Sequence, residues 1–277
     1  MAITTRDGLI NALANNSSRF ILDKASLANQ LAGTYASLWR ATGRPAQGAI
    51  PTTAEVLTNA TTGAIQFANQ TAPMTTYLAY LFAASSNSAM TLEIHDRIAH
   101  MGGLVLNTTS PQTVSGMDLD TLAPPSDRVG SSDYRYVQWW LEVYADGGAT
   151  ASNATINVTF HDGTTGNLNT VSVGGTIQIG RCFNVSALRT TAQQSKNIRG
   201  INSVTLSAST GGAGNVGFTC TRPCATLPMP TLNISNVYDW AQLGLPEIPN
   251  DSCLFPMVLL GATSTGTLRG GGKLVHG

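Results

Sequence analysis

Hydrophobic residues near the N-terminus recur at the spacing of an α-helix. Between residues 26 and 39 the apolar side chains fall at positions i, i+4, i+8, i+11 and i+12, along one side of a helix. These side chains are Leu27, Leu31, Tyr35, Leu38 and Trp39. Residues 6–15 carry a shorter pattern of the same kind, and residues 19–23 indicate an extended segment. The sequence therefore predicts two helices separated by a short strand.

From about residue 62 the pattern changes to that of β-strands. Residues 77–84 form a continuous apolar run, typical of a strand buried on both faces. Residues 90–98 alternate between apolar and polar positions, except at Asp96. Six further short strands, separated by Gly, Asn and Asp turns, are predicted at residues 134–144, 154–160, 171–173, 176–179, 202–208 and 215–220.

Short strands with turns between them favour an antiparallel β-sandwich or a jelly roll. Residues 44–60 have no periodicity and contain several helix and strand breakers, which predicts a linker. We therefore expect a mainly β protein with two parts. Residues 1–60 form an N-terminal helical arm and linker, and residues 61–277 form a jelly-roll-like antiparallel β-sandwich body.

Two distant segments resemble each other, residues 78–100 and residues 254–276. Each contains an apolar strand, a Ser/Thr turn and an amphipathic strand that ends in a basic residue, two apolar residues and His. Duplication of a hairpin and chance similarity in a biased composition both account for this pattern. Duplication predicts that the C-terminus lies beside residues 77–100.

Composition narrows the class of protein. The 277 residues include 15 Lys and Arg against 15 Asp and Glu, and only 11% of residues are charged. A protein that binds nucleic acid needs a basic excess, so we expect no nucleic-acid partner. The apolar runs are too short for a membrane helix, and the start shows no export signal, so we expect no membrane association.

Candidate chemistry is sparse. The chain contains no nucleophile elbow, phosphate-binding loop, zinc-protease motif or EF-hand loop. The close pair Cys220 and Cys224 lacks a second pair for a zinc site, so buried thiols are the simpler interpretation. Asp118 and Asp120 fit a polar loop better than a calcium site. We expect no catalytic residues, no metal site and no cofactor, hence no enzyme.

Aromatic and arginine side chains are the candidates for protein contacts. Trp139 and Trp140 are adjacent on a predicted strand, so one ring should enter the core and the other should face outward. An outward ring could stack on a sugar or anchor a subunit contact, and the contact is favoured. The aromatic and arginine residues of the arm are either core residues or docking anchors. The candidate interface residues are Arg19, Phe20, Trp39, Arg40, Arg44, Trp139 and Trp140.

Three segments together resemble structural proteins of tailed bacteriophages that are otherwise uncharacterised. They are residues 34–51, residues 95–104 with 112–114, and residues 243–254, placed in the same order around a β-rich middle. His95 departs from the pattern, which has a small or aromatic residue there. The resemblance covers nearly the whole chain, carries no catalytic signature, and implies a component of the virion head or neck.

The function expected from these observations is that of a non-enzymatic virion protein. It would be a head decoration or minor capsid (cement) protein on the capsid surface, assembled in the host cytoplasm. Its partners would be copies of itself, with a trimer favoured, and the major capsid protein, over which residues 19–44 would lie. Low charge suits this role because few charges are desolvated on contact. The alternatives are a tail, collar or neck adhesin that binds a host glycan through Trp139 or Trp140, and a virion-borne glycan hydrolase.

Overall fold

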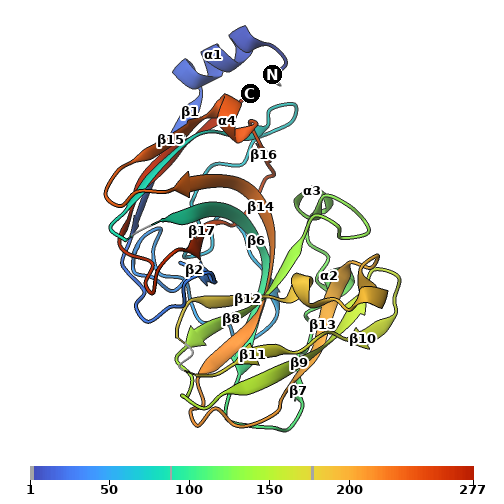
Figure 1. The fold of residues 1–277 in the computed structure, drawn as a ribbon. Helices are drawn as coiled ribbons and strands as arrows, with labels where there is room; N and C mark the ends of the chain where they lie inside the picture. The colour runs from blue at the N-terminus through green and yellow to red at the C-terminus, as the bar shows by residue number, and fades with distance from the viewer. Residues whose placement is uncertain (1–2, 88, 176–177) are drawn as a thin grey trace.

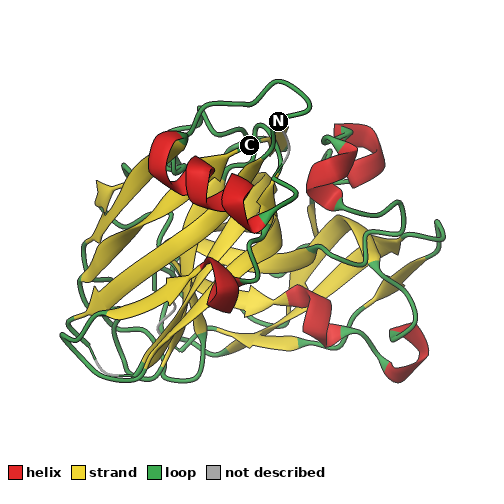
Figure 2. Cartoon of the chain, turned by 90° about the horizontal axis from the view of Figure 1, so that it is seen from above, coloured by secondary structure: helices red, strands yellow, loops and turns green. Residues whose placement is uncertain are grey.

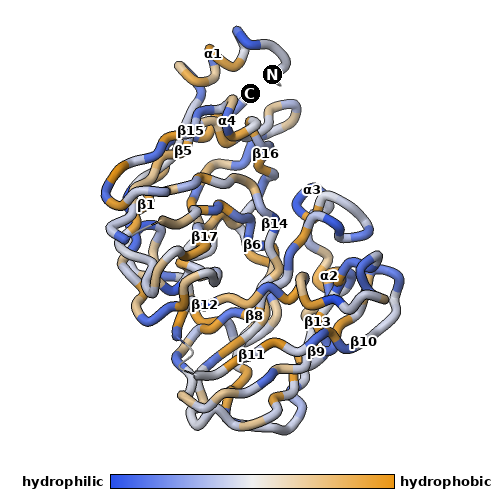
Figure 3. Tube along the Cα trace, viewed as in Figure 1, coloured by the Kyte–Doolittle hydropathy of each residue, from blue (hydrophilic) through white to orange (hydrophobic). Residues whose placement is uncertain are grey.

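The structure of the protein is a computed structural model that describes residues 3–87, 89–175 and 178–277. Over these residues the chain is mainly β, with antiparallel sheets and an N-terminal helix, as the sequence predicts. Hydrophobic positions are spread through all three sheets (Figure 3). Figure 2 shows that the helices lie around the outside of the strands. None of the described helices is long and apolar enough to cross a membrane.

The first sheet combines strands from both ends of the chain. Its strands occur in the order β15 (Asn236–Asp239), β5 (Thr76–Ser85), β18 (Leu268–His276), β1 (Ser17–Lys24) and β3 (Gly43–Arg44), with β16 (Glu247–Ile248) paired to β5.

The second sheet closes into a barrel, because β14 pairs with β8 on one side and with β6 on the other. The strands run in the order β14 (Asn215–Met229), β8 (Gln138–Ala145), β12 (Arg181–Asn184), β2 (Tyr35–Ser37), β17 (Leu254–Leu260) and β6 (Met90–Leu104), with β4 (Glu55–Val56) added on β6.

The third sheet lies on the far side of the barrel from the first (Figure 1). Its strands are β10 (Thr165–Asn167), β9 (Ser152–Phe160), β13 (Ile198–Leu206) and β7 (Gln112–Thr113), with β11 (Val171–Val173) on β9. The helices are α1 (Arg6–Asn15), α2 (Leu119–Leu122), α3 (Ser126–Val129) and α4 (Trp240–Leu243), with 3₁₀ turns at Val185–Leu188 and Thr191–Gln193.

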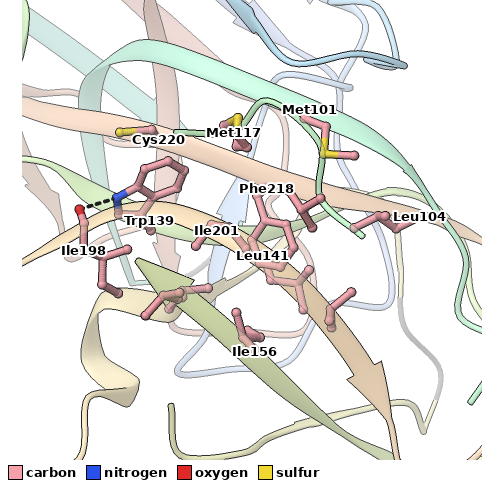
Figure 4. Packing of buried hydrophobic residues seen from close by; sticks show 14 of the residues in the cluster. Met101, Leu104, Met117, Trp139, Leu141, Ile156, Ile198, Ile201, Phe218 and Cys220 are labelled. Carbon is pink, nitrogen blue, oxygen red and sulfur yellow. Dashed lines mark hydrogen bonds between the residues drawn. The ribbon is translucent and has the colours of Figure 1, made fainter. Parts of the chain in front are cut away.

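The barrel is packed on both of its outer sides and also filled inside. Its side toward the third sheet contributes Trp139, Leu141 and Phe218 to the largest apolar cluster (Figure 4). Its side toward the first sheet contributes Leu92 and Ile94 to a second cluster. A third cluster, rich in aromatic rings, fills the interior. Strands of the barrel are therefore buried on both faces.

One of the two predicted helices is present. α1 spans Arg6–Asn15, and the Thr5 hydroxyl caps it by accepting a hydrogen bond from the Gly8 amide. The prediction of a helix over residues 26–39 is wrong. Asn29 and Gly33 adopt positive φ values of 55° and 79°, which a right-handed helix does not allow. Residues 35–37 of that segment pair in the barrel as β2.

The segment that follows α1 forms hydrogen-bonded strands within the sheets and does not extend as a free arm. β1 lies between β18 and β3, and β2 lies between β12 and β17. α1 itself rests on the first sheet, with Leu9 and Ala12 packed against Ala79 and Val275. The predicted boundary at residue 60 thus separates segments that share hydrogen-bonded sheets.

The predicted strands are mostly present, as β5, β6, β8, β9, β11, β13 and β14. Residues 176 and 177, part of the strand predicted at 176–179, lie outside the described residues. The C-terminal strand β18 pairs with β5, and β17 pairs with β6, so the predicted neighbourhood of the C-terminus is confirmed. The two similar segments are not hairpins, however, because β5 and β6 belong to different sheets.

Candidate functional site

Three of the predicted interface residues are buried in the protein. Trp39, Trp139 and Trp140 are each at most 1% exposed. The prediction that one of the paired tryptophans faces outward is wrong, because both faces of β8 are covered. Trp139 packs toward the third sheet and donates to the Ile198 carbonyl at 2.9 Å (Figure 4). Trp140 lies inside the barrel and donates to the Thr221 hydroxyl at 2.9 Å.

Of the remaining predicted residues, Arg19 and Arg44 are exposed and Phe20 and Arg40 are half-buried, and three of the four come together. Arg19, Phe20 and Arg44 line one hollow of about 390 Å³ beside residues 62–66. The Arg40 guanidinium instead donates to the Gly48 carbonyl and holds the following loop. β1 is therefore the element that carries the exposed part of the predicted interface.

β1 also forms part of the outward side of the first sheet. Strand register places Val237, Phe82, Gly271 and Ile21 directly opposite one another across β15, β5, β18 and β1. The next outward row contains Asp239, Tyr80, Lys273 and Arg19. We call this surface the exposed face and define it by these eight residues.

Apolar side chains are concentrated on and beside the exposed face. Nine large hydrophobic side chains are exposed among the described residues. Six of them lie on this face, in α4, or in the loop that leads into β15: Ile21, Phe82, Val237, Trp240, Leu232 and Ile234. Contiguous exposed apolar surface of this kind marks an interaction site more often than scattered residues do.

The exposed face is hollowed next to α1 and α4. A cavity of about 750 Å³ has Leu13 of α1 and Trp240 of α4 on its walls and Gly270 and Gly272 of β18 on its floor. α1 and α4 lie close together at this end of the sheet (Figure 1). The Lys273 ammonium crosses toward α1 and donates to the Leu13 carbonyl.

Cations outnumber carboxylates on the outward side of this sheet. Its charged residues on β1, β3, β15, β16 and β18 comprise four cations and three carboxylates, which gives a formal charge of +1: Arg19, Arg44, Arg269, Lys273, Asp23, Asp239 and Glu247. Arg269 faces Asp23 at 3.6 Å. The Arg19 side chain has no hydrogen-bond or ion-pair partner among the residues that the structure describes.

The barrel interior holds a buried ion pair that the sequence did not single out. Arg97 and Glu142 are 0% and 1% exposed, and their charged groups lie 2.7 Å apart. The Tyr144 hydroxyl contacts both side chains, and the guanidinium lies 4.5 Å from the centre of the Trp39 ring and 5.2 Å from that of Phe255. The only signal in the sequence was that Arg97 falls on the polar side of a strand, and that side faces the interior.

His100 extends this network to the surface. Its Nδ1 accepts a hydrogen bond from Arg97 Nε at 3.0 Å, and its Nε2 lies 2.9 Å from Glu55 on β4. Burial and the neighbouring Arg97 lower the pKa of His100 to about 2. The ring is therefore neutral at ordinary pH, with Nε2–H donating to Glu55, and it joins β4 to the barrel.

A second row of hydrogen-bonded side chains inside the barrel has the distances expected between a nucleophile, a base and an acid. Thr221 Oγ1 lies 3.0 Å from His95 Nδ1, and His95 Nε2 lies 2.7 Å from Glu93. The Thr221 hydroxyl is fully buried and already accepts a hydrogen bond from Trp140. No substrate can reach it in this conformation, so these contacts order the barrel interior.

Outside the barrel, Asp96 fixes the long loop that carries α3. The Arg128 guanidinium donates to both Asp96 oxygens, at 2.8 and 2.6 Å, and both side chains are buried. Asp96 also accepts from the Cys253 amide at 2.8 Å. No group of three or more His, Cys, Asp or Glu residues within the described ranges is placed to hold a metal ion.

The four thiols are free, as expected, and they make stability sensitive to alkaline pH. Burial raises the pKa of Cys224 and Cys253 to about 12 and that of Cys182 and Cys220 well above the ordinary value of 9.0. In the unfolded chain these thiols ionise near 9. A raised folded pKa therefore means that stability is fully present below pH 9 and falls as the pH rises above it. Burial lowers the pKa of Lys24 from 10.5 to about 8. This one group has the opposite effect, because it makes stability rise with pH between those two values.

We expect the free energy of unfolding to decrease as the pH rises from about 9 toward the folded pKa values near 12, by at most about 1.4 kcal/mol per pH unit for each thiol. Urea unfolding at a series of pH values under reducing conditions measures this slope. The Cys220→Ala variant should show a shallower slope than the parent. Equal slopes in both proteins would contradict the contribution of the buried Cys220 thiol to the pH dependence.

Comparisons with known proteins do not identify a family. No protein-family model matches the chain, and no curated protein matches it. Among solved structures, the chain is similar to that of the infectious bursal disease virus Gx strain, at 10% identity over 95% of this chain and 81% of that chain, with a TM-score of 0.20. For the Gt strain of the same virus the values are 11%, 95%, 81% and 0.19. TM-scores this low do not establish a common fold.

Proposed function

We propose that this chain is a structural protein of a bacteriophage particle, namely a decoration or minor capsid protein that binds to copies of itself and to the major capsid protein. The single observation that carries the proposal is the exposed face with its neighbouring apolar side chains. Six of the nine large exposed hydrophobic side chains in the described part of the chain gather there. A protein that works alone rarely keeps such a surface open to water.

The composition supports the same role. Only 11% of residues are charged and the formal net charge is zero, so contacts over a wide surface desolvate few charges. The three segments that resemble phage proteins, at residues 34–51, 95–104 with 112–114, and 243–254, add the bacteriophage context. We propose a homotrimer on the capsid surface, assembled in the host cytoplasm, with no catalytic activity.

The contact geometry in this proposal differs from a flexible arm. Residues 19–44 include β1, β2 and β3, which are paired within the protein. Arg19 can thus meet a capsid subunit only as part of the exposed face. The docking element we propose is a rigid sheet surface, which loses less conformational entropy on binding than an arm would.

Copy number in purified particles tests the proposal. A decoration or minor capsid protein is present on the scale of the capsid lattice, so quantitative mass spectrometry should find this chain in a fixed, high ratio to the major capsid protein. The tail proteins of the same particles provide the internal low-copy standard. Detection at the copy number of a tail or collar protein, or absence from the particle, would contradict it.

A second candidate function is that of a tail, collar or neck adhesin for a host glycan. The observation that favours it is the placement of Trp240 and Tyr80 beside Asp239 in the 750 Å³ hollow, since aromatic faces and carboxylates are groups that bind sugars. The isolated protein should then inhibit adsorption of the phage to its host. The Trp240→Ala variant should not inhibit it.

A further inference from the structure

We propose that the exposed face is the docking site for a narrow, acidic and amphipathic segment of a partner protein. The segment would place aliphatic side chains along the row formed by Val237, Phe82 and Ile21, and carboxylates near Arg19 and Lys273. This inference deepens the proposed docking function and rests on it.

The apolar part of the site is a continuous row. Val237, Phe82 and Ile21 are 46%, 37% and 55% exposed. Gly271 lies between Phe82 and Ile21 in register and has no side chain, so the row is lowest there. The Phe82 ring lies against this glycine, since a Cβ added at Gly271 would be 3.3 Å from the ring edge. The Phe82 ring therefore covers part of Gly271 and lies between Val237 and Ile21 in the apolar row.

Shape limits what can bind. The hollow next to this row is bounded by Leu13 of α1 on one wall and by Trp240 of α4 on another. Because α1 packs over Ala79 and Val275, it rises above the plane of the strands at this end of the face. A single extended strand or one helix fits beside such walls, whereas a flat sheet cannot close over them.

The positive charge on the outward side of the sheet favours a negatively charged partner. The outward side of the sheet has a formal charge of +1 within a chain whose net charge is zero, with four cations against three carboxylates. Lys273 and Arg19 are opposite each other on β18 and β1, one row from the apolar residues. Arg19 has no ionic partner among the described residues, and its charge is available to a carboxylate. Two copies of the same face would bring like charges together, which disfavours direct pairing of one copy with another.

A pair of peptides tests the inference on the full-length protein. The probe is a short fluorescein-labelled peptide in which Leu and Val alternate with Glu, and the control is its counterpart with Lys in place of Glu. Fluorescence anisotropy should show binding of the acidic peptide only. The Arg19→Glu and Phe82→Ser variants should each weaken that binding by about tenfold or more, as expected for reversal of an exposed ion pair or loss of an apolar anchor. Raised salt should weaken it further.

A matched surface variant keeps the test specific. Ile10 is 55% exposed on α1 but lies outside the exposed face, so Ile10→Ser should bind the acidic peptide like the parent protein. Circular dichroism and urea unfolding confirm that every variant is folded.

Equal binding of the two peptides, absence of binding, or binding unchanged by Arg19→Glu would overturn the inference. Sedimentation that shows reversible self-association lost in Phe82→Ser would overturn it in favour of a second copy as the occupant. Binding of a neutral oligosaccharide in place of the peptide would favour the adhesin. Copy number in the particle is measured separately, so failure of this site leaves the structural role itself open to its own test.

Discussion

The substitution Arg97→Met is expected to lower the free energy of unfolding by about 3–5 kcal/mol, because it leaves a buried carboxylate without its cation. Glu142 is 1% exposed and would keep only the Thr219 and Tyr144 hydroxyls as partners of its charged oxygen. Methionine fills a similar length of the barrel interior, so little of the effect comes from lost volume. Equilibrium urea unfolding, followed by tryptophan fluorescence, measures the change.

Two controls separate the buried charge from other effects. The double variant Arg97→Met with Glu142→Leu removes both charges and should recover much of the lost stability, since a buried pair costs desolvation free energy on both sides. Among the residues that the structure describes, Arg97 Nη1 and Glu142 Oε1 have no hydrogen-bond partner, which makes this recovery more complete. The exposed pair Arg269 and Asp23 is the matched surface case, and Arg269→Met should cost about 0–1 kcal/mol. A single substitution at Arg97 as mild as that at Arg269 would contradict the burial of the pair.

The substitution Trp140→Ala should destabilise the protein by about 3–5 kcal/mol, the range for removing a large buried aromatic side chain. The Trp140 ring lies inside the barrel, 4.8 Å from the Tyr35 ring and 6.2 Å from the His95 ring. Its Nε1–H donates to Thr221, so the variant also leaves that hydroxyl without one partner. The loss of packing and the lost hydrogen bond act in the same direction.

Trp240 provides the control for this prediction. It is 39% exposed at the start of α4, so Trp240→Ala should change the free energy of unfolding by less than about 1 kcal/mol while it alters the hollow of the exposed face. Thermal and urea unfolding of both variants measure the difference. Similar losses at the two tryptophans would mean that Trp140 is not a core residue in solution.

Patterns within single elements predicted the fold class well, but they predicted poorly which face of a strand is buried and what covers it. The apolar run at residues 77–84 predicted β5, and the alternation at residues 90–98 predicted β6, because both patterns depend only on neighbouring residues. The same alternation placed Arg97 on a polar side. That side turned out to be the inside of a closed barrel, where a charge needs Glu142 as its partner.

The candidate site was predicted in part. Arg19 belongs to the exposed face and Phe20 is its neighbour in β1, but the residues across the sheet from them come from β18 and β5, more than 50 positions away in the sequence. Val237 and Trp240 were not singled out, since no local pattern distinguishes an exposed apolar residue from a core residue. For the same reason, one ring of the pair Trp139 and Trp140 was expected to face outward, although both rings are buried.

By itself the sequence determined that the chain is mainly β, that α1 forms near the N-terminus, and that few charges are available for a surface. These properties follow from composition and from short-range periodicity, which act on each segment independently. Only the tertiary structure decided which strands close into a barrel, which polar residues are inside it, and which apolar residues are left exposed. Those properties depend on pairing between distant segments, and a strand shows two faces in its sequence without showing what covers either one.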